Sequence, residues 1–168
     1  MHKDLLCYYS SFFRDHFAVK REAIQQHTMY LPDDSAEDFT FIIDYIYRAT
    51  PVTFPPGENV MARCTNIIKL AKKVDIVESV DALCPVLKNN FESFKTPPCL
   101  LEADFIELVY NVTPKGCMIR LTVAQRAVFE FSKPRESRFN QLIQENDEFA
   151  ADVFRKAREG GGWISFQF

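Results

Sequence analysis

The groups best suited to chemistry at the start of the chain are one thiol and two imidazoles. Cys7 lies close in sequence to His2 and His16, and a thiol beside an imidazole is the arrangement of a nucleophilic hydrolase. No orienting carboxylate and no oxyanion donor can be assigned to these residues, so a Cys/His hydrolase stands only as the competing hypothesis. The three histidines, His2, His16 and His27, are too scattered in pattern for a metal site. The sequence thus predicts no catalytic residue, no cofactor and no metal.

Two further patterns suggest chemistry but have a simpler structural explanation. The glycines of residues 160–162 lack the preceding strand and the Lys-Ser/Thr pair of a phosphate-binding loop, so we expect them to end a helix. The lysines within residues 69–73 and the arginines within residues 155–158 share helical faces, but neither group alternates with exposed aromatic residues. Both basic faces are therefore expected to be solvated.

The charge balance argues against nucleic acid and membrane partners. The 20 basic and 23 acidic residues give a net charge of −3, which offers no attraction to a polyanion. No apolar run reaches the ~18 residues that a membrane span requires. Five cysteines at wide, irregular spacing do not form a disulfide framework, and so the chain is expected in a reducing compartment, the cytoplasm or the nucleus.

The elements that must position any site are predominantly helical. Apolar spacing predicts an amphipathic helix from Asp4 to about Phe17, and residues 25–31 are short enough to form a strand. Ser35 is expected to cap the helix that follows it. Further apolar stripes predict helices over residues 60–71, 80–94, 101–112, 124–131 and 139–157, with Pro85 kinking or restarting the second of them.

The composition predicts a module boundary at Thr96-Pro97-Pro98. We therefore divide the chain into residues 1–96, a helical extension over 97–159, and a glycine-rich hinge and tail over 160–168. The eight residues expected to form the core, because amphipathic stripes must bury one another, are Phe12, Phe17, Phe39, Ile43, Ile46, Tyr47, Ile68 and Leu87.

The opening stretch carries a family resemblance. Its spacing resembles the signature of the BTB/POZ domain, a protein-interaction fold, and further stretches over residues 30–33, 39–47 and 67–77 match in the same order. The resemblance covers about residues 2–95, is most similar to fungal BTB proteins, and begins after the place of the family's N-terminal hairpin. The signature residues are His2, Lys3, Leu6, Ser10 and Phe13.

The resemblance implies a BTB-like helical cluster with one or two short strands, followed by a helical extension: a mainly α fold. It also implies a non-enzymatic adaptor or scaffold that binds a protein partner or a second copy of itself. Lys3 matches a family position in a charged pocket at the dimer interface. The alternative is a substrate adaptor for a cullin ubiquitin ligase, but the apolar-x-Glu motif of such adaptors is not met at Glu22, which has Lys20 two residues before it.

The absent hairpin is expected to leave an apolar surface and an open strand edge that favour aggregation or partner binding. Residues 163–168 alternate with the period of a half-buried strand, and pairing with residues 26–31 would cover that edge. The competing expectation is a mobile terminus.

Overall fold

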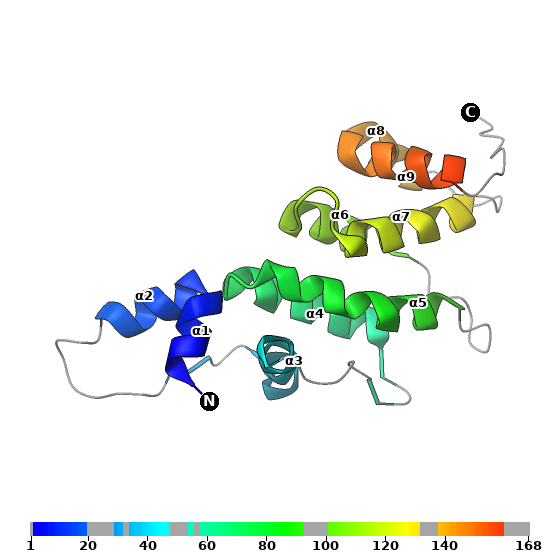
Figure 1. Ribbon diagram of the computed structural model, residues 1–168. Coiled ribbons are helices and arrows are strands. Elements are labelled where there is room, and N and C mark those ends of the chain that lie inside the picture. Colours follow the sequence, from blue (N-terminus) through cyan, green and yellow to red (C-terminus); the bar gives the residue numbers. More distant parts are fainter. Residues whose placement is uncertain are drawn as a thin grey trace. The chain divides into compact units, whose positions relative to one another are not determined.

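A computed structural model describes residues 2–19, 29–31, 34–47, 54–55, 58–92, 101–131 and 138–159. The chain forms two compact units, Met1–Ala82 and Leu83–Phe168 (Figure 1). All regular structure in the described ranges is helical, which confirms the predicted mainly α fold.

The first unit is organised around a packed helix pair. Helix α3 packs against α4, and α1 packs against both α2 and α3. Ser35 caps α3 as predicted, since its hydroxyl oxygen accepts hydrogen bonds from the N–H groups of Glu37 and Asp38. The helices of this unit are α1 (Lys3–Tyr9), α2 (Ser11–Val19), α3 (Ala36–Ile46), α4 (Val60–Lys73) and the 3₁₀ helix η1 (Val77–Leu83), whose last residue opens the second unit.

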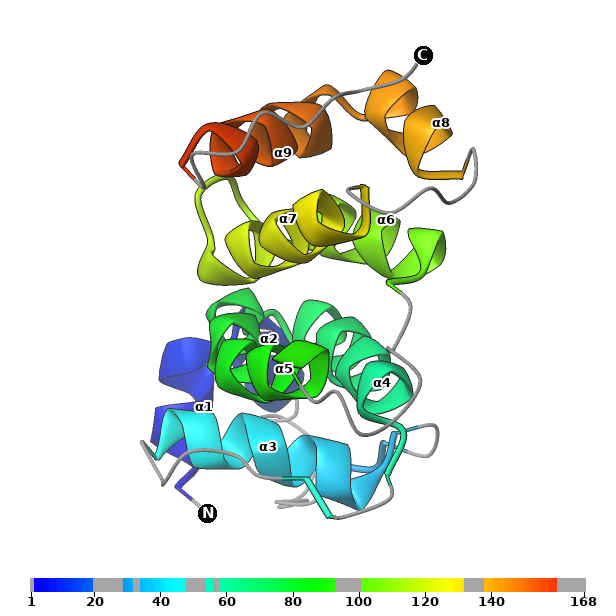
Figure 2. The ribbon, with the colours of Figure 1, turned by 90° about the vertical axis from the view of Figure 1, so that its right-hand side faces the viewer.

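The second unit is arranged around α7. This helix packs against α5, α6 and α9, and α8 packs against α9 and α6. Within the unit, α8 and α9 lie on the side of α7 that faces away from α5 (Figure 2). Its helices are α5 (Cys84–Glu92), α6 (Ala103–Val112), α7 (Met118–Phe131), α8 (Arg138–Glu145) and α9 (Asp147–Glu159).

Ser10 divides the single helix predicted from Asp4 to Phe17 into α1 and α2. Its backbone is extended, with φ −135° and ψ 121°. The Ser10 hydroxyl donates to the Val74 carbonyl oxygen at 2.5 Å and accepts from the Phe13 N–H at 3.1 Å, so it caps α2. The prediction was wrong because the apolar spacing continues across the break, while the break is set by a contact 64 residues away.

Asn146 likewise divides the single helix predicted over residues 139–157. Its side-chain oxygen accepts a hydrogen bond from the Phe149 N–H at 2.9 Å, so a new helix, α9, begins there.

At Pro85 the predicted restart is confirmed, because η1 ends at Leu83 and α5 begins at Cys84. A proline in the first helical turn lacks only an N–H that would have had no partner in the helix.

The predicted core residues differ in their burial. Ile46, Ile68 and Leu87 are buried, and Phe12, Phe17, Phe39 and Ile43 are half-buried. Tyr47 is a correction, because 41% of it is exposed. It follows the last turn of α3, whose buried residues are Asp38, Phe41, Ile42 and Ile46, so the inward stripe has ended before it.

The predicted strand segments fall largely outside the described residues. Residues 25–28 and the whole tail 160–168 lie there, so the proposed pairing between them stays a prediction. Residues 29–31 are described and have no regular secondary structure. The described part of the chain therefore contributes no strand to the fold.

Candidate functional site

The structure does not assemble the thiol–imidazole pair considered from the sequence. Cys7 is half-buried on α1, and no hydrogen bond joins it to His2 or His16 among the described residues. The His16 ring packs edge-on against Phe17, with centroids 5.5 Å apart. His27 lies outside the described residues. No group of three or more metal-ligating side chains occurs in the part of the chain that the structure describes.

Three of the signature residues meet at one buried junction. Leu6, Ser10 and Phe13 are 3%, 1% and 2% exposed. Beside them the Ser11 hydroxyl donates to the carboxylate of Asp75, whose φ of 56° turns the chain at the end of α4. Together with the bond from Ser10 to Val74, these contacts fix α1 and α2 on the end of α4.

The other two signature residues lie on the surface. The His2 backbone N–H donates to the Tyr47 hydroxyl at 2.9 Å, and the His2 Nδ1 lies 3.1 Å from the same oxygen. The Lys3 ammonium lies 4.9 Å from the centroid of the Phe17 ring, which is a cation–π contact. The His2 contacts tie the start of α1 to the end of α3 and give Tyr47 a polar role at the surface, whereas the Lys3 contact joins α1 to α2.

Helix α1 presents an apolar surface that its own unit does not bury. Leu6 is the only residue of α1 that is buried within the described structure. Leu5 and Tyr9 are half-buried, and Tyr8 is 80% exposed with its ring edge-on to that of Tyr9 at 5.2 Å. Leu5, Tyr8 and Tyr9 have the i, i+3, i+4 spacing of one helical face. We name these three residues the α1 outer face.

An arginine also bridges α3 and α4 within the first unit. The Arg63 Nε lies 3.2 Å from the Asp38 carboxylate, and its Nη1 donates to Glu58 at 2.6 Å. Its guanidinium lies 4.9 Å from the Phe54 ring centroid. The pKa of Asp38 is raised on balance, chiefly by burial, although the neighbouring Arg63 guanidinium acts to lower it.

The second unit contains a buried polar cluster around Arg120 that the sequence analysis missed. Arg120 is only 4% exposed. Its Nε donates to the Thr113 hydroxyl at 3.1 Å, and its Nη2 donates to the carbonyl oxygens of Tyr110, at 2.7 Å, and Thr113. Its Nη1 donates to the carboxylate of Glu148. One guanidinium therefore joins α6, α7 and α9.

Tyr110 extends this cluster. Its ring centroid lies 4.7 Å from the Arg120 guanidinium, and its hydroxyl donates to Asp152 at 3.0 Å. Burial, and next the charge of Asp152, raise the pKa of Tyr110. Hydrogen bonds from Lys115 and Arg120 lower the pKa of Glu148. The available sequence signal was an arginine placed between apolar residues of a helix, which indicates a buried charge.

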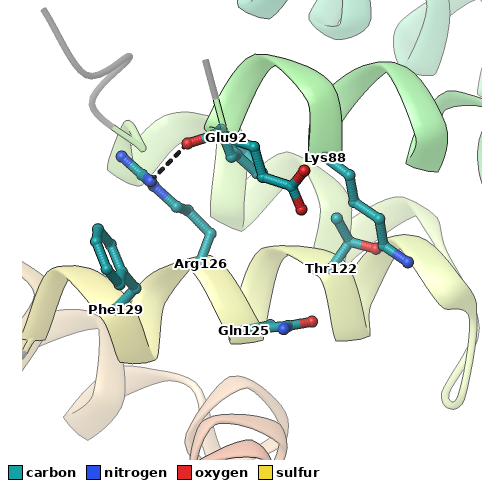
Figure 3. A pocket seen from close by; sticks show the side chains of 7 residues that line it. Lys88, Glu92, Thr122, Gln125, Arg126 and Phe129 are labelled. Carbon is teal, nitrogen blue, oxygen red and sulfur yellow. Dashed lines mark hydrogen bonds between the residues drawn. The ribbon is translucent and has the colours of Figure 1, made fainter. Parts of the chain in front are cut away.

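A groove of about 320 Å³ lies between α5 and α7 (Figure 3). On its floor the Arg126 guanidinium lies 5.3 Å from the Phe91 ring centroid and 5.2 Å from that of Phe129. Arg126 donates to the Phe91 carbonyl oxygen at 3.1 Å and to the Glu130 carboxylate at 2.8 Å. Among the described residues, those that line the groove are Lys88, Phe91, Glu92, Thr122, Gln125, Arg126 and Phe129.

The remaining basic faces behave as ordinary surface. Lys73 pairs with Asp34 at 2.5 Å and Arg155 pairs with Asp152 at 2.7 Å, and such exposed pairs add little stability. Among the described helices, none combines the length and the apolar composition that crossing a bilayer would take.

In comparisons with known proteins, residues 1–91 match the family model of the BTB/POZ domain, which covers α1 to α5. No curated protein and no solved structure matches the chain. BTB/POZ domains are protein-interaction modules. Because the family model spans more than half of the sequence, this chain belongs to the BTB/POZ domain family.

Proposed function

We propose that this protein is a non-enzymatic adaptor or scaffold of the cytoplasm or nucleus, and that it associates with a second copy of itself through the α1 outer face. The observation that carries the proposal is the 80% exposure of Tyr8 on a helix that buries a single residue within the described structure. An apolar surface of this kind on a family of interaction domains indicates an interface.

The chemistry of the α1 outer face suits a self-complementary contact. Tyrosine supplies a large contact area at low conformational entropy and is enriched at energetic hot spots. The exposed polar residues His2 and Lys3 border the apolar residues and would form a wet rim. A two-fold axis through Tyr8 would bring two copies of the same face together.

The test is the mass of the full chain in solution, measured by size-exclusion chromatography with light scattering. We expect the wild type to be dimeric and Tyr8→Asp to be monomeric at the same concentration, because a carboxylate would be desolvated in the interface. Tyr30→Asp is the matched control, since Tyr30 is 84% exposed and lies on no helix. A wild type that stays monomeric, or equal masses for all three proteins, would contradict the proposal.

The alternative function is a substrate adaptor for a cullin ubiquitin ligase. Adaptors carry their apolar-x-Glu motif in the segment that corresponds to residues 18–24, and residues 20–24, with Glu22, lie outside the described residues. A pull-down with a cullin N-terminal fragment separates the two functions. Retention of the wild type and loss of the Glu22→Lys variant would support the cullin alternative.

The division into domains is part of the proposal. Residues 1–96 would act as the interaction domain, 97–159 as a helical extension and 160–168 as its hinge and tail. The last helix of the family match, α5, packs against α7. This contact supports an extension built directly on the end of the BTB/POZ domain.

A further inference from the structure

We propose that the break between α1 and α2 is a switch that regulates the α1 outer face: when a second copy of the chain binds, residues 3–19 join into one continuous helix. This regulation rests on the proposed self-association. Three observations support it. An apolar repeat continues through the break, two hydroxyl groups maintain the break, and two helical hydrogen bonds are not formed there.

The apolar repeat has the phase of one unbroken helix. Leu5, Tyr9 and Phe12 stand at i, i+4 and i+7. Leu6 and Phe13 keep the same phase, because they are also two helical turns apart. In the structure α1 and α2 run in different directions, so Phe12 does not continue the stripe of Leu5 and Tyr9 (Figure 1). One continuous helix would extend the α1 outer face to Phe12.

The break is maintained by two hydroxyl groups and not by a helix-breaking residue. Ser10 is 1% exposed, and its hydroxyl donates to the Val74 carbonyl oxygen at 2.5 Å. The adjacent hydroxyl of Ser11 donates to the Asp75 carboxylate. Residues 3–19 contain neither proline nor glycine, so the backbone can continue as a helix once these two bonds are released.

Backbone hydrogen bonds of the helical kind already reach the break from both sides. The Ser10 N–H donates to the Leu6 carbonyl oxygen at 3.0 Å, and the Arg14 N–H donates to the Ser10 carbonyl oxygen at 3.1 Å. Within the described structure, the N–H groups of Ser11 and Phe12 donate to no carbonyl oxygen of α1. Joining the helices would give each of them an acceptor one turn earlier, which offsets part of the cost of releasing Ser10.

A second copy shifts this balance because it contacts the continuous helix over a larger apolar area. The added residue is Phe12, which is half-buried and lies edge-on to Phe13 with ring centroids 5.3 Å apart. An aromatic ring buried between two copies removes a large apolar area from water. In the isolated chain the bonds of Ser10 and Ser11 favour the broken form, so the extended face forms together with the dimer.

The experiment compares Ser10→Ala with Ser10→Gly in the full chain. Both substitutions remove the same hydroxyl, but alanine favours the interior of a helix over glycine by an amount equivalent to about fivefold in population. The dimer dissociation constant, measured by sedimentation equilibrium, should therefore be about fivefold lower for Ser10→Ala than for Ser10→Gly. The matched control is Ala62→Gly, an alanine-to-glycine exchange at an exposed position on α4, which should dimerise as the wild type does.

Amide hydrogen exchange resolved by NMR identifies the continuous helix directly. The amides of Ser11 and Phe12 should be better protected in Ser10→Ala than in Ser10→Gly. In the wild type, which needs no substitution, the same two amides should gain protection as the concentration rises and the dimer forms. A purely structural role of Ser10 would instead lower protection throughout α1 in both variants, with no gain at Ser11 and Phe12.

The outcomes separate this regulation from the proposed function. A wild type that never dimerises contradicts the proposed function and this regulation with it. A dimeric wild type overturns the regulation alone if Ser10→Ala and Ser10→Gly have equal dissociation constants, or if Ser11 and Phe12 gain no protection on dimerisation. Circular dichroism and the exchange rates in α3 check that both Ser10 variants keep the fold.

Discussion

The two units each contain a partly or fully buried arginine, but they use it differently. In the first unit the Arg63 side chain is 17% exposed and pairs with Asp38 and Glu58 beside an aliphatic core. In the second unit the Arg120 side chain is 4% exposed and donates to two main-chain carbonyls, a hydroxyl and a carboxylate. The first arginine lies at the margin of its core, whereas the second joins three helices.

This difference indicates what holds each unit together. Burial of aliphatic surface is non-directional and stabilises both units, through fully buried residues such as Ile42 and Ile67 in the first and Val109, Ile119 and Val153 in the second. Hydrogen bonds from a buried guanidinium depend on direction and fix the placement of α6, α7 and α9. Both units should therefore respond to lost apolar volume, and the second should respond in addition to the loss of one charged group.

The largest effect is expected from Arg120→Met. Methionine fills similar apolar space but leaves the carbonyl oxygens of Tyr110 and Thr113 buried without a donor, so we expect a loss of about 4 kcal/mol in unfolding free energy. Lys115→Met is the matched control, because Lys115 pairs with the same Glu148 but is 79% exposed. Its cost should stay below about 1 kcal/mol.

Amide hydrogen exchange, followed separately in α3 and α7, measures this effect unit by unit. Arg120→Met should speed exchange in α7 far more than in α3. Similar losses in Arg120→Met and Lys115→Met would show that the second unit does not depend on the buried cluster.

A smaller effect is expected from a pair of adjacent substitutions in α3. Ile42 is 0% exposed and Ile43 is half-buried. Ile42→Ala should cost about 3 kcal/mol because it leaves a cavity, and Ile43→Ala about 1 kcal/mol. Urea unfolding of the two variants measures the difference, with exchange in α3 as the local readout. Equal costs would mean that the inward register of α3 is not the one described.

Much of the fold could be predicted because it depends on local periodicity and capping. The stripe of α4, the cap at Ser35 and the restart at Pro85 are encoded within a few residues of where they act. Ser10 and Asn146 were missed for the opposite reasons. Ser10 ends α1 through a partner just after α4, Val74, that is distant in sequence, and Asn146 interrupts an apolar repeat that continues on both sides.

The candidate surfaces could be predicted only in part. The apolar residues of α1 are evident in the sequence, but their exposure depends on which side of the helix its neighbours cover. The role of Arg120 depends on a tertiary contact with Glu148, and that of Arg126 depends on one with Phe91. No periodicity in the sequence encodes such distant partners.

The smallest expected effect is a pH dependence of opposite sign in the two units. Hydrogen bonds from Lys115 and Arg120 lower the pKa of Glu148 below 4.5, so its contribution to stability is present above that pH and is lost as the pH falls through the folded-state pKa. Burial raises the pKa of Asp38 above 3.8, so its contribution is present below that pH and is lost as the pH rises through the folded-state pKa. On acidification, the contribution of Glu148 to the stability of α7 should therefore fall, while the contribution of Asp38 to the stability of α3 should rise.

Hydrogen exchange from about pH 6 to about pH 3, corrected for intrinsic rates, tests these two pH dependences through Glu148→Gln and Asp38→Asn. The stability advantage of wild type over Glu148→Gln in α7 should shrink as the pH falls, and that over Asp38→Asn in α3 should grow. Two changes of the same sign would contradict the contrast between a half-exposed, hydrogen-bonded carboxylate in one unit and a buried carboxylate in the other.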